Sequence, residues 1–82
     1  MPQFPSKEAQ KKFYEDQIEE LAKINLQNEY TRLRNVKRLE IAKEEKDLAT
    51  EAAVQAELDK VEREFKSSEL YIAVANEELA KL

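Results

Sequence analysis

Carboxylates are the most numerous groups in this sequence that could do chemistry, and two pairs of them have helical spacing. Glu15 and Glu19 are four residues apart, as are Asp16 and Glu20, so a helix would place each pair on one face. The chain contains no His and no Cys. The commonest general base, the commonest neutral metal ligand and the best nucleophile are therefore missing.

The missing residue types exclude several classes of site. A di-iron helical bundle needs a Glu-x-x-His motif, which a chain without His cannot supply. A calcium loop and a phosphate-binding loop both need glycine, and the chain has none. We therefore assign no catalytic, cofactor-binding or metal-binding residue. We expect a protein that is not an enzyme and takes no small-molecule substrate, with its carboxylates on solvated helix faces.

A group of basic residues is the remaining candidate site. Arg34, Lys37 and Arg38 share one helix face, and Tyr30 lies one turn before Arg34. Such a stripe could contact phosphates while the tyrosine stacks on a base. However, the net charge is −4, whereas nucleic-acid-binding domains are usually strongly basic. We expect a solvated or internally paired face, with nucleic-acid binding as the less favoured alternative.

Helices are the elements that must position these groups. The chain has no Gly, and its two prolines are Pro2 and Pro5, so nothing after them forces a break. Charged residues make up 39% and hydrophobic residues 41%, which is typical of long exposed helices rather than of a disordered chain. The sequence predicts an all-α protein in which residues 1–5 form an extended leader and Ser6 caps the first helix.

Two apolar stripes run along the predicted helical region. The stripe in the second half alternates by four and three residues, as in a coiled coil: Val54, Leu58, Val61, Phe65, Ser68, Ile72, Ala75, Leu79 and Leu82. The stripe in the first half is broader: Tyr14, Ile18, Leu21, Ala22, Leu26, Tyr30, Leu33, Val36 and Leu39. Extending the second stripe backwards reaches five charged positions in succession, so the stripe shifts phase or the chain turns.

An antiparallel helical hairpin explains both stripes. We predict a helix over 6–47, a turn near 48–50 and a helix over 51–82, with Asp47 and Thr50 available as caps. The alternative is one continuous helix of about 75 residues, about 110 Å long. Folding back joins the stripes, and the predicted core seam is then Leu33, Val36 and Leu39 against Val54, Leu58, Val61, Phe65, Ile72 and Leu79.

Apolar residues outside this seam predict a partner. A two-helix hairpin has one internal face, so a second apolar face implies another layer. The candidate contact residues are Ile24, Leu70, Tyr71 and Val74. We expect a homo-oligomeric helical bundle that serves as an assembly or adaptor protein and contacts itself, a protein partner or both. The longest apolar run, 70–75, is far below the roughly 20 residues of a membrane span. We therefore expect no membrane contact and a cytoplasmic location, inside the host cell if the protein is viral.

One segment resembles a known family. The stretch RLRNVKRLEIAKEEKDLATEAAVQAEL, residues 32–58, is similar to the helical oligomerisation region of phage small terminases. The resemblance covers about a third of the chain, rests on helical residues of common type, and lacks a preceding helix-turn-helix. It implies an alternative function as the oligomerisation module of a nucleic-acid packaging assembly.

Overall fold

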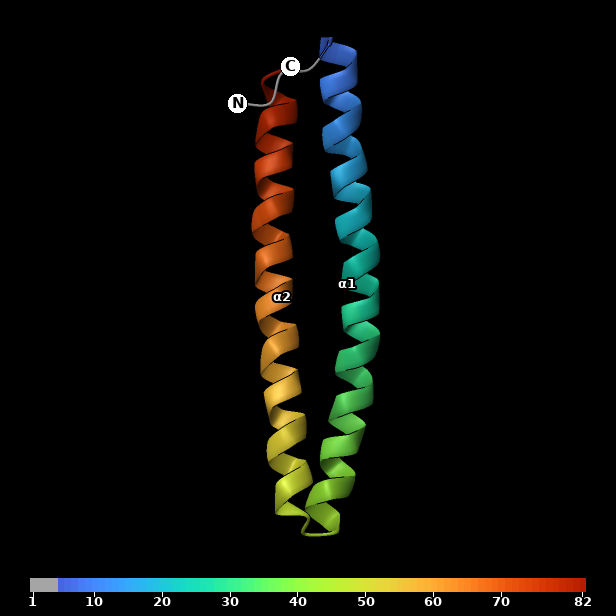
Figure 1. Cartoon of the computed structure of the whole chain (residues 1–82), viewed down its shortest axis with the longest axis vertical. Helices are drawn as coiled ribbons and strands as arrows, with labels where there is room; N and C mark the ends of the chain where they lie inside the picture. The colour runs from blue at the N-terminus through green and yellow to red at the C-terminus, as the bar shows by residue number, and fades with distance from the viewer. Residues whose placement is uncertain (1–4) are drawn as a thin grey trace.

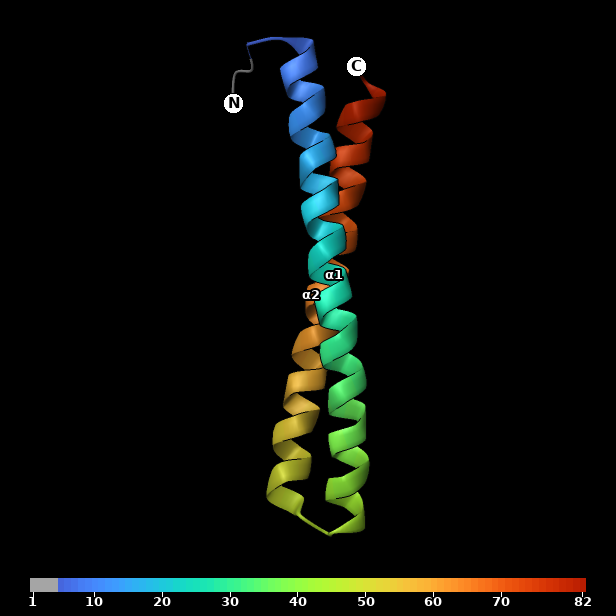
Figure 2. The same ribbon diagram turned by 90° about the vertical axis from the view of Figure 1, so that its right-hand side faces the viewer.

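Two long helices fold back on each other to form a hairpin. The computed structural model describes residues 5–82, in which α1 spans Lys7–Glu44 and α2 spans Leu48–Ala80. The helices run antiparallel, so residue 5 and the C-terminus lie at the same end and the turn at the other (Figure 1). The molecule measures 58 × 19 × 17 Å. A view turned by 90° shows the helices crossing part-way along their length (Figure 2). The hairpin prediction is confirmed, and the single continuous helix is not adopted.

Each helix begins at a side chain that caps its first turn. The first four N–H groups of a helix lack partners within the helix, so an oxygen from a capping side chain stabilises them. Ser6 Oγ accepts a hydrogen bond from the Ala9 N–H at 3.1 Å, as predicted. Asp47 Oδ1 accepts one from the Thr50 N–H at 3.1 Å, and the Thr50 hydroxyl donates to Asp47 Oδ2 at 2.6 Å. The predicted leader falls outside the described residues except for Pro5.

The turn lies at residues 45–47, three residues before the predicted 48–50. Lys46 adopts the left-handed conformation with φ 57°, which glycine usually supplies at the end of a helix. The Lys46 N–H then donates to the Lys43 carbonyl at 3.2 Å, and the Asp47 N–H donates to the Ala42 carbonyl at 2.9 Å. These two bonds form a Schellman motif. Because Asp47 both completes this motif and caps α2, the connection needs no further residues.

The hairpin interior is narrow and lined by small side chains. Among residues 5–82, the buried apolar side chains are Ala42, Val54, Val61 and Ala75. The larger members of the α2 seam flank this row and are half-buried: Leu58, Phe65, Ile72 and Leu79. Two helices cannot surround a large side chain, so bulky seam residues stay partly in contact with solvent. The core of the single hairpin is correspondingly small.

Candidate interaction surface

The face that α1 turns toward α2 is polar in its central part. The α1 residues that are buried or half-buried along this face are spaced by three and four: Tyr14, Ile18, Leu21, Asn25, Asn28, Thr31, Asn35, Leu39 and Ala42. Both ends of this row are apolar, and the middle contains three asparagines. Asn35 is 0% exposed and Asn28 is 8% exposed. The sequence therefore predicts the wrong α1 residues for the centre of the seam.

Leu33 and Val36 do not line the hairpin interior, contrary to the prediction. Leu33 is 55% exposed and Val36 is 37% exposed, whereas Leu39 is half-buried and faces α2. The apolar ends of the row set the rotation of α1 about its axis. That rotation points Asn35 inward, and Leu33, two residues away and about 200° around the helix, points outward.

Three amide atoms of this polar row are buried without a hydrogen-bond partner among residues 5–82. They are Asn25 Oδ1, Asn28 Nδ2 and Asn35 Nδ2. The other end of the Asn35 amide is satisfied, because its Oδ1 accepts a hydrogen bond from Arg38 at 3.0 Å. A buried polar group without a partner costs about 1–3 kcal/mol. The centre of the hairpin therefore weakens the fold.

A groove between the helices collects most of the predicted contact residues. A depression of about 540 Å³ is lined by residues that include Leu21, Ile24, Ser67 and Tyr71. A second depression, of about 210 Å³, shares Leu21 and Tyr71 with the first and continues to Val74 and Phe13. We call the combined feature the Tyr71 groove; its apolar and small lining residues include Phe13, Leu21, Ile24, Ser67, Tyr71 and Val74.

All four predicted contact residues are exposed, but only three of them line the groove. Tyr71 is 58% exposed, and Ile24 and Val74 are each about half exposed. These three side chains come from both helices and converge on the Tyr71 groove. Leu70 is also exposed but does not line the groove. Phe13 also lines the groove, although it is not among the predicted contact residues.

A second apolar surface runs along the outer side of α1. Leu26 is 74% exposed, and Tyr30 and Leu33 are also exposed. Spacings of four and three place these side chains on one helix face. Their apolar character predicts a place in the core stripe, whereas the structure places them on the side away from α2. We call this surface the Leu26 stripe.

The predicted phosphate-contacting residues already have partners within the chain. Arg34 lies over the Tyr30 ring at 5.9 Å, a cation–π distance. Lys37 pairs with Glu40 at 3.4 Å. Arg38 bridges the two helices through Glu57 at 3.1 Å, a half-exposed pair worth about 0–1 kcal/mol. These contacts hold the basic side chains along the helix surface instead of presenting them together.

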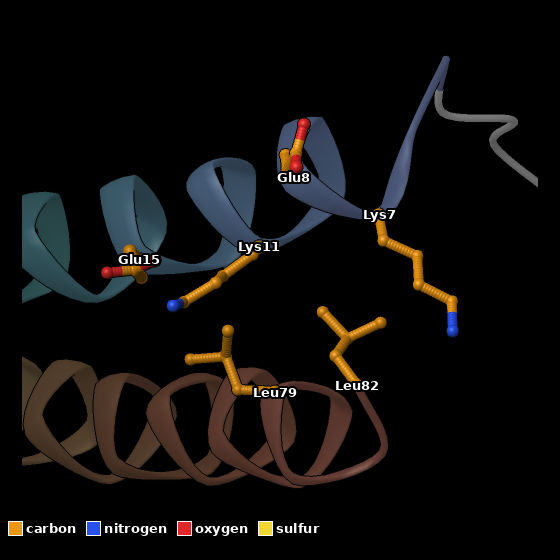
Figure 3. Close-up of a pocket in the computed structure, with 6 residues that line it drawn as sticks. All are labelled: Lys7, Glu8, Lys11, Glu15, Leu79 and Leu82. Atoms are coloured by element: carbon orange, nitrogen blue, oxygen red, sulfur yellow. The ribbon is translucent and has the colours of Figure 1, made fainter.

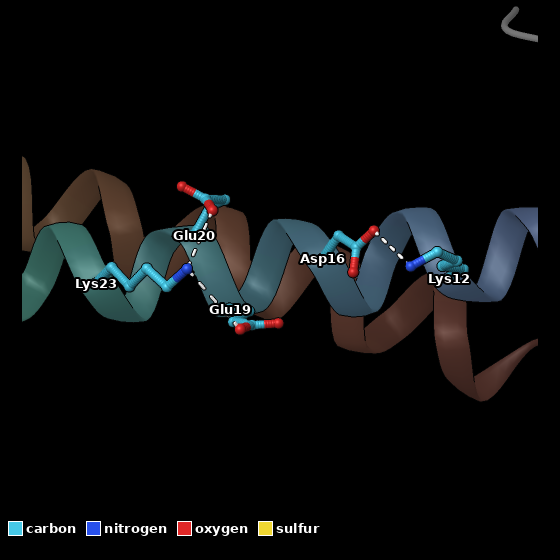
Figure 4. A network of polar contacts seen from close by, with 5 residues as sticks. All are labelled: Lys12, Asp16, Glu19, Glu20 and Lys23. Atoms are coloured by element: carbon cyan, nitrogen blue, oxygen red, sulfur yellow. Dashed lines mark hydrogen bonds and ion pairs between the residues drawn. The ribbon is translucent and has the colours of Figure 1, made fainter.

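Three of the four carboxylates in the acidic pairs of α1 form ion pairs with lysines on the same helix. Asp16 pairs with Lys12 at 3.4 Å, and Lys23 pairs with Glu19 at 3.9 Å and with Glu20 at 3.5 Å (Figure 4). Nearer the turn, a hydrogen bond from Arg32 lowers the pKa of Glu29, and the same bond raises the pKa of Arg32. In the part of the chain that the structure describes, no group of three or more acidic residues could hold a metal ion.

The open end of the hairpin contains a further pocket of about 470 Å³. Leu79 and Leu82 of the C-terminal end face α1 across it, and Lys7 and Lys11 extend along its opposite side (Figure 3). Glu8 and Glu15 complete the lining. The mixture of two leucines with opposite charges gives this pocket no single chemical preference.

Comparison of the chain with protein-family models, curated proteins and solved structures gave no match. Within residues 5–82, neither helix has the length of apolar sequence that a membrane span requires.

Proposed function

We propose that this chain is a non-catalytic helical assembly protein that self-associates through the apolar surfaces its hairpin leaves exposed. The observation that carries the proposal is the surface area. The chain exposes 6448 Å², whereas a folded monomer of its 9.6 kDa mass exposes about 5,100 Å². The excess, on the order of 1,300 Å², exceeds the roughly 800 Å² that each partner buries in a standard protein interface.

The chemical character of the exposed surface supports self-association, because an elongated shape explains the excess area but not its apolar side chains. Among residues 5–82, large hydrophobic side chains are exposed at twelve positions, which include Ile24, Tyr71 and Val74 of the Tyr71 groove and the three residues of the Leu26 stripe. The buried apolar residues in the same part of the chain are two valines and two alanines. Each large apolar side chain that moves from water into an interface contributes about 1.5–3 kcal/mol. A bundle of hairpins therefore supplies the hydrophobic core that one hairpin lacks.

Solution mass measured across a wide concentration range tests this proposal. We expect sedimentation equilibrium to give a mass of two or more chains, with dissociation on dilution. Thermal unfolding followed by circular dichroism should shift to a higher midpoint as concentration rises, because association stabilises only the folded state. A helical monomer at every concentration, with a midpoint independent of concentration, would overturn the proposal.

A further inference from the structure

Charged residues flank the hydrophobic centre of each exposed surface in a fixed order. Steps of four and three residues extend the Leu26 stripe in both directions through exposed side chains. The resulting stripe row is Glu19, Lys23, Leu26, Tyr30, Leu33, Lys37 and Glu40. The same steps along the α2 wall of the Tyr71 groove give a second row, the wall row: Lys60, Glu64, Ser67, Tyr71, Val74, Glu78 and Lys81. The ends of the stripe row read acid then base from outside to centre, and those of the wall row read base then acid.

This order disfavours contact between two copies of the same row. Two stripe rows place acid on acid and base on base in either direction, because each row carries the same charges when read from either end. Two wall rows do the same, for example by setting Lys60 against Lys81 and Glu64 against Glu78. Like charges that meet across an interface disfavour the contact. A stripe row against a wall row instead sets opposite charges together at all four charged positions.

We propose that the Tyr71 groove of one copy holds the Leu26 stripe of a second copy, with α1 of the second copy parallel to α2 of the first. This inference rests on the proposed self-association and specifies its two surfaces. Both rows take a step of four and then a step of three in the N-to-C direction, so the parallel arrangement matches all seven positions. Lys60 then lies beside Glu19 of the second copy, and Val74 lies beside its Leu33.

The charged ends of the rows are already ordered in the single hairpin. Lys23 pairs with Glu19 at 3.9 Å, Lys37 with Glu40 at 3.4 Å and Lys81 with Glu78 at 3.0 Å. Each pair lies along its own helix, so an adjacent pair of reversed order adds two further attractions. These exposed charges contribute chiefly to the choice of partner surface and register.

The contact extends along the whole of α2. The offset of 41 residues between Glu19 and Lys60 also places Lys7 beside Leu48 and Leu39 beside Ala80. The contact therefore covers the 33 residues of α2, about 50 Å at 1.5 Å per residue.

This length provides enough surface for a stable contact. A helix about 50 Å long and 10 Å in diameter has a lateral surface on the order of 1,600 Å². The half that faces the groove is on the order of 800 Å², the area that each partner buries in a standard interface. One like-charged pair lies near the turn of the first copy, where Asp16 of the second copy reaches Glu57. Each of these carboxylates keeps a basic partner in its own chain, Lys12 at 3.4 Å and Arg38 at 3.1 Å.

Mixing two variants tests the contact between unlike surfaces. The groove variant carries Tyr71→Glu with Val74→Lys, and the stripe variant carries Leu26→Glu with Leu33→Lys. We expect each variant alone to sediment with the mass of one chain, because each has lost one of the two surfaces. An equal mixture should sediment with the mass of two chains and no more, since one intact groove meets one intact stripe.

The control is Ala73→Glu with Asn76→Lys, which repeats the spacing and charge change two residues along α2. We expect it to keep the mass of the natural chain. A mixture that stays at the mass of one chain, or either variant alone keeping the natural mass, would overturn the inference. Loss of helical content in either variant would also overturn it, because the substituted residues would then hold the hairpin itself together.

Disulfide formation tests the direction with substitutions at the ends of the rows. The natural chain has no cysteine, so Lys60→Cys, Glu19→Cys and Glu40→Cys each introduce one unique thiol. We expect Lys60→Cys mixed with Glu19→Cys to form mainly the mixed disulfide under mild oxidation, as measured by intact-mass spectrometry. Lys60→Cys mixed with Glu40→Cys should give only the statistical half. A preference for the second mixed product, or for neither, would contradict the parallel arrangement.

The combined results separate this inference from the proposed function. A natural chain that associates, with variants whose mixture does not restore a two-chain species, keeps self-association and removes the contact between groove and stripe. A natural chain that is monomeric at all concentrations removes both. Monomeric variants that restore a two-chain species on mixing support both.

Discussion

Replacing Asn35 with leucine tests whether the polar centre of the hairpin weakens it. The Asn35 side chain is 0% exposed, and its Nδ2 has no hydrogen-bond partner in the described chain. Removing the unpaired group should recover about 1–3 kcal/mol, and burying a leucine side chain should add about 1.5–3 kcal/mol. Against these gains stand the lost hydrogen bond from Arg38, about 0.5–1.5 kcal/mol, and a packing cost of about 1–3 kcal/mol for the larger side chain.

The expected net effect of Asn35→Leu is a stabilisation of about 2 kcal/mol. The packing cost should lie at the low end of its range, because two helices can separate slightly where a core enclosed on all sides cannot. Arg38 keeps a charged partner in Glu57, at 3.1 Å, so the substitution leaves no cation unpaired. For a chain of this size, each kcal/mol raises the melting midpoint by about 4–8 °C. We therefore expect an increase of roughly 10 °C at fixed protein concentration.

The assay is thermal unfolding by circular dichroism, with Asn76→Leu as the matched control. Asn76 is exposed on α2, so the same replacement there should change stability by no more than about 0.5 kcal/mol. The solution mass of each variant must also be measured, because an asparagine in a helical seam can fix register and oligomer state at a cost in stability. A midpoint for Asn35→Leu at or below that of Asn76→Leu would refute the assigned cost of the buried amide.

Three further predictions concern the seam and the turn. Phe65→Ala should cost about half of the 3–5 kcal/mol typical of a fully buried phenylalanine, since Phe65 is half-buried; an unchanged midpoint in urea unfolding would remove it from the core. Lys46→Gly should raise the melting midpoint, because glycine adopts the left-handed conformation without the strain of about 1 kcal/mol that a side chain adds; a lower midpoint would contradict this reading of the turn. The hydrogen bonds from Thr50 lower the pKa of Asp47 in the folded chain, so its stabilising contribution is present above the ordinary aspartate pKa of about 3.9 and is lost as pH falls through the folded value. The melting midpoint of the natural chain should therefore fall more on acidification below that pH than the midpoint of Asp47→Asn, and parallel curves would exclude this contribution.

The hairpin and the α2 seam were predictable because α2 obeys one simple rule. From Val54 to Leu79, residues spaced by four and three are apolar or small, and this periodicity identifies the inward face of a helix. A turn was also predictable, since extending the α2 seam toward the N-terminus reaches five charged positions in succession. Its location was misplaced by three residues because Lys46 supplies a conformation usually associated with glycine. No local pattern distinguishes this lysine from its neighbours.

The inward face of α1 was not predictable from hydrophobicity alone. The correct row follows from extending Leu39 and Ala42 backwards by the coiled-coil spacing, which passes through Asn35, Asn28 and Asn25. Because a search for apolar residues rejects these positions, it selected Leu26 and Leu33 on the other side of the helix. A search for regular spacing anchored at the apolar ends of α1 would have identified the row. The Tyr71 groove was partly predictable, since Ile24, Tyr71 and Val74 lie off both apolar seams.

The two apolar surfaces of α1 bear on how far assembly proceeds. Leu26 lies two residues from Ile24, about 200° around the helix, so the Leu26 stripe and the Tyr71 groove point in nearly opposite directions. Leu26 is 74% exposed, so the stripe is apolar surface that the groove does not share. If the chain self-associates as proposed, a contact through one of these surfaces leaves the other exposed.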